Sequence, residues 1–82
     1  MPTLPHSTTV EYNMSVDNVI EFGKRIKKMR LAKGLSQTEV AKELGADKSF
    51  MSNLENGRKN PTLKTILKLA KALGVNSDQL LK

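Results

Sequence analysis

Four glycines divide most of this 82-residue chain into short segments. Gly34, Gly45, Gly57 and Gly74 each follow a run in which apolar residues recur at helical intervals. A glycine at such a place favours the left-handed conformation that ends a helix, because it has no Cβ to clash with the backbone. The pattern therefore predicts a series of short helices that end at these glycines.

Capping residues mark the starts of the helices between the glycines. Ser36 and Glu39 fit a capping box, in which each side chain bonds the backbone N–H of the other residue. Asp47, Thr62 and Asn76, the last with a glutamine three residues later, stand where N-caps are expected. Together with the apolar spacing, these signals predict five helices, at residues 16–33, 37–44, 48–56, 63–73 and 77–81.

The apolar residues of the predicted helices are expected to form one core. Their helical spacing selects Val19, Phe22, Ile26, Met29, Val40, Ala41, Leu44, Met51, Leu54, Ile66, Leu67, Leu69, Ala70, Leu73, Leu80 and Leu81. The chain has no cysteine and is too short for two domains, so we predict a single all-α domain over residues 15–82. Residues 1–14 contain two prolines and a Ser-Thr-Thr run, and we predict that they form a flexible tail.

The charge of the chain suits a polyanionic partner, although a basic balance also simply keeps a protein soluble. Fourteen Lys and Arg residues against eight Asp and Glu residues give a net charge of +6. The first 17 residues carry only Glu11 and Asp17, so the remainder has 14 basic and six acidic residues and a charge of +8. The folded part is therefore more basic than the whole chain.

Several classes of protein are disfavoured by the residues present. His6 stands alone in the tail, and the chain shows neither clustered carboxylates at metal-ligand spacing nor a glycine-rich phosphate loop. We therefore expect no catalytic site, no metal site, no cofactor and no small-molecule ligand. An export signal and an apolar run of membrane-spanning length are also missing, so a cytoplasmic, nucleoid-associated location is expected.

The two central helices are separated by only three residues, at 45–47. A short glycine-containing turn between two short helices is typical of a helix-turn-helix unit. On a helical wheel of residues 48–56, Ser49, Asn53 and Asn56 point away from the core, while Glu55 leans back toward it. The outward side thus carries hydrogen-bonding groups without a carboxylate, which suits the major groove of DNA. Asn53 can pair with adenine, and Ser49 suits several bases.

Lys48 and Phe50 flank this outward side. Lys48 can donate hydrogen bonds to guanine. For Phe50 two interpretations stay open: it completes the core or covers the preceding helix, or it touches a thymine methyl group in the groove. The lysines at 24 and 28 and those at 64, 68 and 71 are interpreted mainly as solvated faces, with the first two also adding weak attraction to phosphates.

The stretch LSQTEVAKELGADKSFMSNLENGRKNPTLKTILKLAKALGVNSDQLL resembles the Cro/CI-type (Xre family) helix-turn-helix domain, and the match runs from about Phe22 to Leu81. The resemblance implies a lambda-repressor-like bundle of five helices with the third in the major groove of double-stranded DNA. It implies base contacts by Lys48, Ser49 and Asn53, and phosphate contacts by Gln37, Asn56, Arg58 and Lys59. This sequence departs from many relatives at Lys48 and Phe50, which leaves the target sequence open.

The resemblance also implies a pair between Arg30 and Glu55 that bridges the first and third helices and orients Arg30 toward a phosphate. The pair is either exposed and weak or buried and costly to break; we favour the buried alternative.

We therefore predict a sequence-specific transcriptional regulator that binds a pseudo-palindromic operator as a homodimer. Val75, Leu80 and Leu81 are the candidate dimer surface, with closure of the core as the alternative role for these residues. No second domain is visible in the sequence, although a piece of a longer regulator would look the same. The alternative function is a protein-interaction module on the same fold, as in antitoxin-like or coactivator-like domains.

Overall fold

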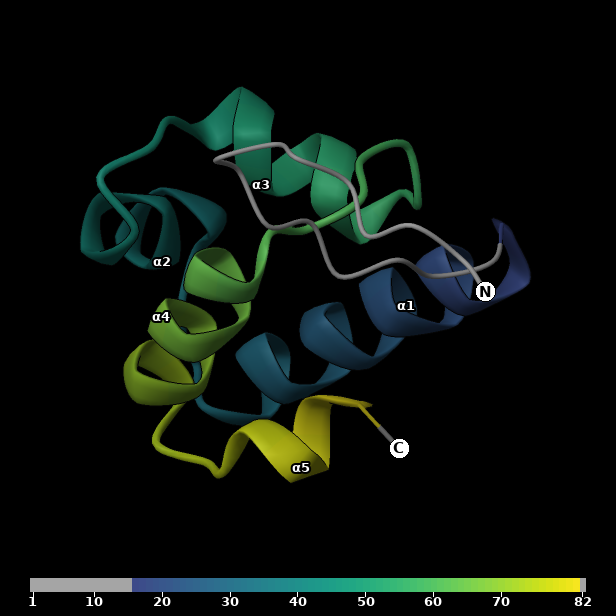
Figure 1. The fold of residues 1–82 in the computed structure, drawn as a ribbon. Helices are drawn as coiled ribbons and strands as arrows, with labels where there is room; N and C mark the ends of the chain where they lie inside the picture. Colours follow the sequence, from purple (N-terminus) through teal and green to yellow (C-terminus); the bar gives the residue numbers. More distant parts are fainter. Residues whose placement is uncertain (1–15, 82) are drawn as a thin grey trace.

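The structure is a computed structural model that describes residues 16–81, and the secondary-structure elements within this range are helices joined by short loops (Figure 1). The five helices are α1 (Val16–Ala32), α2 (Gln37–Glu43), α3 (Lys48–Glu55), α4 (Leu63–Leu73) and α5 (Ser77–Leu81). The predicted all-α fold with five helices is confirmed. The first three helices end one residue earlier than predicted. The predicted tail at residues 1–14 and His6 lie outside the described residues.

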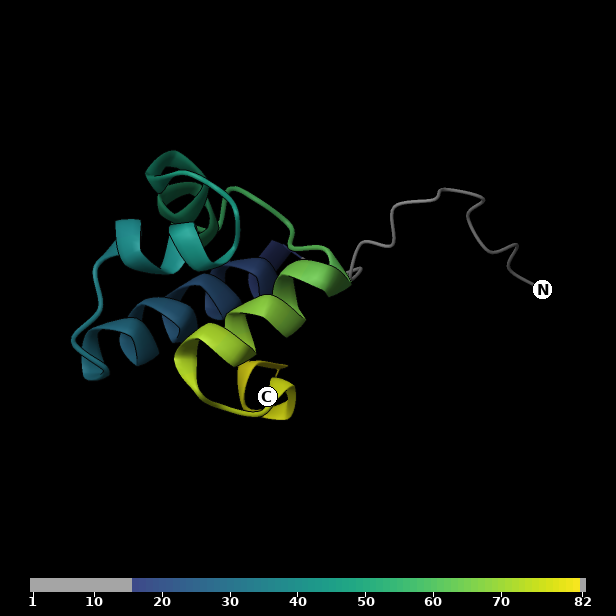
Figure 2. The same ribbon diagram turned by 90° about the vertical axis from the view of Figure 1, so that its left-hand side faces the viewer.

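The helices form a bundle in which α3 and α5 lie at opposite ends (Figures 1 and 2). α1 and α4 lie between these two ends, and both contact α5. α2 and α3 pack on each other, while α1 packs against α3 and α4 packs against α2. α3 is therefore supported from inside by α1 and α2, and its remaining side is left for solvent.

The helix ends follow the local signals in the sequence. The four glycines predicted to end helices have φ values between 67° and 72°, in the left-handed region. Ser36 and Glu39 form the complete capping box, with Glu39 N–H donating to Ser36 Oγ at 3.0 Å and Ser36 N–H donating to Glu39 Oε1 at 2.9 Å. Thr62 Oγ1 accepts from the backbone of Thr65 at 3.1 Å. At the start of α5, Asn76 N–H donates to the side chain of Gln79 at 2.9 Å.

The core contains nearly all of the predicted apolar residues. Those that are buried are Val19, Phe22, Ile26, Val40, Ala41, Leu44, Met51, Leu54, Ile66, Leu69, Ala70, Leu73 and Leu80. Met29 and Leu81 are half-buried at its edge. The prediction was wrong for Leu67, which is 54% exposed, because the neighbouring helices cover only the side of α4 that carries Ile66, Leu69 and Leu73.

None of the described helices combines the length and hydrophobicity that a membrane span requires.

Candidate nucleic-acid interface

α3 is anchored along its inner side. Met51 and Leu54 are completely buried in the core, which fixes the rotation of the helix about its axis. Asp47 Oδ1 accepts a hydrogen bond from Phe50 N–H at 2.9 Å, so the first turn is capped as the sequence predicted. The side of α3 that faces solvent is therefore set by these anchors.

The solvent-facing side of α3 and its C-cap carry a polar row, made of Ser49, Asn53 and the C-cap residue Asn56 and called the outer row below. All three side chains are exposed, and Lys48 is exposed at the start of the helix. Glu55 has turned inward and is only 5% exposed. α3 thus presents hydrogen-bonding groups to solvent with no exposed carboxylate among its own residues.

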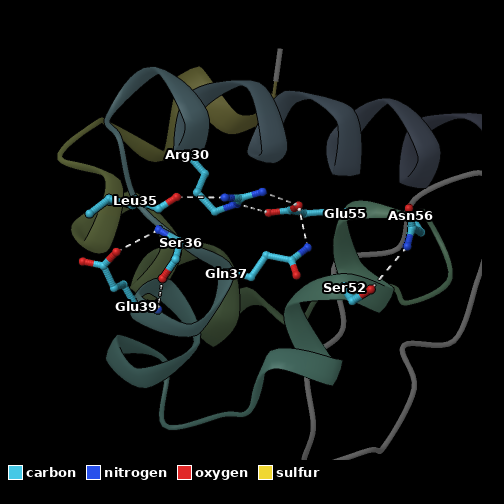
Figure 3. A network of polar contacts seen from close by, with 8 residues as sticks. All are labelled: Arg30, Leu35, Ser36, Gln37, Glu39, Ser52, Glu55 and Asn56. Atoms are coloured by element: carbon cyan, nitrogen blue, oxygen red, sulfur yellow. Dashed lines mark hydrogen bonds and ion pairs between the residues drawn. The ribbon is translucent and has the colours of Figure 1, made fainter.

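A buried polar network ties α3 to α1 and to the start of α2 (Figure 3). Arg30 Nε donates to Glu55 Oε2 at 2.6 Å, and Arg30 Nη2 donates to Glu55 Oε1 at 3.1 Å. Arg30 Nη1 donates to the carbonyl of Leu35 at 2.8 Å, and Gln37 Nε2 donates to Glu55 Oε1 at 3.1 Å. The predicted ion pair between α1 and α3 is present, and it is buried.

The network constrains the orientation of Arg30. All three guanidinium nitrogens donate to protein acceptors, and the side chain is 8% exposed. The expected contact between Arg30 and a phosphate stays a prediction: each terminal nitrogen keeps a second N–H, but little of the side chain is accessible. Arg30 also orients Glu55, whose second partner is Gln37 on the first turn of α2. The half-buried Gln37 is therefore held in place by the pair that joins α1 to α3.

Gly23 is a structural residue that the sequence analysis missed. A Cβ built on Gly23 would lie 2.5 Å from the carbonyl oxygen of Leu54 and 2.6 Å from that of Glu55. The backbone of α1 therefore touches the last turn of α3 directly, at a place where only glycine fits. A glycine inside a helix costs about 0.5–1 kcal/mol relative to alanine, so its presence there was the available hint.

The loop after α3 adds exposed cations beside the outer row. Arg58 and Lys59 are both exposed. Just before them, Asn56 Nδ2 donates a long hydrogen bond of 3.4 Å to Ser52 Oγ. Lys59 Nζ lies over the ring of Phe50, 5.1 Å from its centroid. The Phe50 ring is half-buried and packs against the edge of the core. Lys59 of this loop thus lies beside α3.

The three residues proposed for dimer contacts differ in exposure. Leu80 is completely buried within its own chain, and its carbonyl accepts a hydrogen bond from Arg25 Nη1 at 2.8 Å. This removes the Leu80 side chain from the expected dimer surface, because it has no accessible area to offer. Val75 and Leu81 are half-buried against the core and keep some exposed surface.

Groups for metal binding are absent from residues 16–81, in which no three His, Cys, Asp or Glu side chains cluster. The lysines at 24, 28, 64, 68 and 71 are exposed, and Lys24 lies 3.9 Å from Glu21 in an exposed pair. Exposed pairs of this kind contribute little to stability.

Comparison with known proteins identifies a matching family and a similar transcriptional regulator. Residues 26–80 match the model of a family described as helix-turn-helix. An uncharacterized helix-turn-helix-type transcriptional regulator from the SPbeta prophage of Bacillus subtilis is 46% identical over 61 residues. These residues are 74% of this chain and 56% of the relative, so the chain spans little more than half the length of that protein.

Solved structures of a controller protein and a repressor are similar to this chain in fold and in sequence. The restriction-modification controller protein C.AhdI from Aeromonas hydrophila is 41% identical, with a TM-score of 0.75 over 78% of this chain and 97% of that protein. The P22 c2 repressor, solved in complex with a synthetic operator, is 31% identical, with a TM-score of 0.70 over 74% of this chain and 92% of the solved chain. Both matches extend over nearly the full length of the other solved chain.

Proposed function

The chain belongs to the helix-turn-helix family that residues 26–80 match, and on this premise we propose that it is a sequence-specific, DNA-binding transcriptional regulator. The single observation that carries the proposal is the outer row of α3. Ser49, Asn53 and Asn56 are exposed together on a helix whose other side is anchored in the core. A rigid helix with exposed polar side chains and no exposed carboxylate can enter the major groove without repelling the phosphates.

The residues of α3 are assigned to base contacts. Asn53 lies in the middle of the outer row and has the amide that pairs with the N6 and N7 atoms of adenine. Ser49 lies one turn earlier on the same side, and Lys48 at the start of the helix can donate to guanine. These three residues therefore determine the preferred sequence in this proposal.

The residues around α3 are assigned to phosphate contacts. Asn56 is the last residue of the outer row, Arg58 and Lys59 follow it along the chain, and Gln37 stands at the first turn of the neighbouring helix. Contacts to phosphates set the position of a protein on the duplex but carry no direct sequence information. The positive charge of the chain supports this assignment, since it favours a polyanion.

We propose further that the regulator binds as a homodimer to a pseudo-palindromic operator. One α3 helix contacts only a few base pairs, and a two-fold dimer doubles the contacts with half-sites about 34–36 Å apart. Val75 and Leu81 remain the candidate surface, since both keep accessible area beside the core. The relatives named above are regulators and controller proteins, and we propose no enzymatic activity for this chain.

Selection of bound sequences from a random pool of duplexes tests the proposal. We expect an enriched motif with two-fold symmetry, and an affinity that falls steeply between about 50 and 200 mM salt. A pool that shows no enrichment, together with no duplex binding at low salt, would contradict the proposal and favour a protein-interaction module on the same fold.

Two matched variants then separate base contacts from phosphate contacts. Asn53→Ala is expected to relax the preference at one base pair, at a cost of about 1–3 kcal/mol for the preferred sequence. Lys59→Ala is expected to weaken binding to all sequences alike. It is also expected to reduce the slope of the logarithm of the binding constant against the logarithm of the salt concentration by about one, since one phosphate contact is lost. An unchanged base preference in Asn53→Ala would remove that residue from the site.

A further inference from the structure

Phe50 and Lys59 form a contact that links α3 to the loop that follows it along the chain. Lys59 Nζ lies 5.1 Å from the centroid of the Phe50 ring, within the range in which an ammonium group is attracted to an aromatic face. The rest of the ring packs against the edge of the core, so the position of the ring is fixed by this packing. Within residues 16–81, Lys59 makes no ion pair with a carboxylate.

The contact lies next to the outer row. Phe50 is three residues before Asn53, and side chains at this spacing are neighbours on a helix surface. The ammonium group on the ring is therefore held beside the residues assigned to base contacts. An ammonium group over a ring keeps N–H donors that point away from the ring, and these remain available to a phosphate oxygen.

Because the Phe50 ring holds the Lys59 side chain before DNA binds, it lowers the entropic cost of binding. A free lysine side chain loses rotamer entropy when it is fixed on a phosphate, and a preorganised one has already lost part of it. The same geometry argues against a thymine contact, because the core covers part of the ring and the ammonium group covers a face.

We propose that Phe50 is a positioning residue: its ring holds the Lys59 ammonium group at the edge of the DNA-binding surface for contact with a phosphate. Phe50 then raises the affinity for every duplex and does not select a base. The inference rests on the proposed function, because it assigns a role in DNA binding.

The contact itself is testable without DNA. Protons above an aromatic face are shifted upfield in the NMR spectrum, so the terminal CH₂ protons of Lys59 are expected upfield of those of the other exposed lysines. Phe50→Leu, which keeps an apolar side chain against the core, is expected to return them to the ordinary lysine position. Lysine signals that are identical in the two proteins would overturn the proposal.

The role in binding is testable by a double-mutant cycle on a selected duplex. Phe50→Leu is expected to weaken binding about two- to fivefold for all duplexes, because the Lys59 side chain must then be ordered when it contacts a phosphate. In the Lys59→Ala background, Phe50→Leu is expected to have no further effect. Phe50→Tyr, which keeps the aromatic face, is expected to bind like the original protein. As a control, the effects of Phe50→Leu and Lys71→Ala are expected to add, since Lys71 lies in the last turn of α4.

The outcomes distinguish this inference from the proposed function. If Phe50→Leu and Lys59→Ala add, and Phe50→Leu changes the preference at one thymine, Phe50 contacts a base and the inference is wrong. If the unmodified protein binds no duplex at all, the proposed function itself fails, even where the NMR shift shows the contact. Coupled effects with an unchanged base preference support both.

Discussion

Replacing Gly23 by alanine tests the packing that supports α3. The new Cβ would lie 2.5 Å from the carbonyl oxygen of Leu54, whereas ordinary contacts begin near 3.4 Å. α1 and the end of α3 would have to separate by 3.4 − 2.5, or about 0.9 Å, to relieve the clash. No side-chain rotation can help, because the atoms on both sides belong to the backbone. Phe22 and Ile26 are buried beside this contact, so the separation would also loosen the core.

The expected magnitude is the difference between two effects. Overpacking of a core costs about 1–3 kcal/mol, and a backbone clash belongs in the upper part of that range. Alanine regains about 1 kcal/mol over glycine through its higher helix propensity. Gly23→Ala is therefore expected to lower the free energy of unfolding by about 1–2 kcal/mol. The melting temperature should fall by about 4–8 °C per kcal/mol for a domain of this size.

Thermal and urea denaturation followed by circular dichroism measure this change, and Lys27 offers a matched control. Lys27 is exposed on the same helix, so Lys27→Ala should be more stable than Lys27→Gly by about 1 kcal/mol. At position 23 the order should reverse, with glycine more stable than alanine. If alanine is the more stable residue at both positions, the close contact between α1 and α3 does not constrain the fold and the argument is refuted.

Two further predictions concern the polar groups that hold the helices. Glu55→Gln leaves the buried Arg30 without its counter-charge and is expected to cost about 3–5 kcal/mol in urea denaturation; a cost below about 1 kcal/mol would contradict a buried pair. The backbone N–H and the hydroxyl of Ser36 hold the pKa of Glu39 below its ordinary value of 4.5. The unfolded chain therefore binds more protons than the folded one near this pH, so the stabilisation is complete above 4.5 and lost as the pH falls through the lowered pKa. Glu39→Gln should remove this part of the pH dependence, and an unchanged profile in that variant would assign it to other carboxylates.

Features that depend on neighbours along the chain were predictable from the sequence. A positive φ at Gly34 or Gly74, and the capping box of Ser36 and Glu39, arise within a few residues of backbone, so local residue types are sufficient to indicate them. The outer row of α3 was predictable for a related reason. The helical repeat determines which side chains oppose Met51 and Leu54 as soon as those two are assigned to the core.

Features that depend on the distance between helices were not predictable in this way. Leu67 has helical apolar spacing, yet the neighbouring helices do not reach it, and no local pattern states where they end. Phe50 left two interpretations open, because its contact with Lys59 depends on the course of the loop after α3.

The sequence by itself determined where the helices begin and, to within one residue, where they end, and also which side of α3 faces solvent, because these features follow from short-range backbone geometry. Only the tertiary structure decided that Gly23 touches the end of α3, that Arg30 donates to Glu55, and that Leu80 is buried within its own chain. These contacts join residues far apart along the chain, and they exist only when the packed helices set the distances between them.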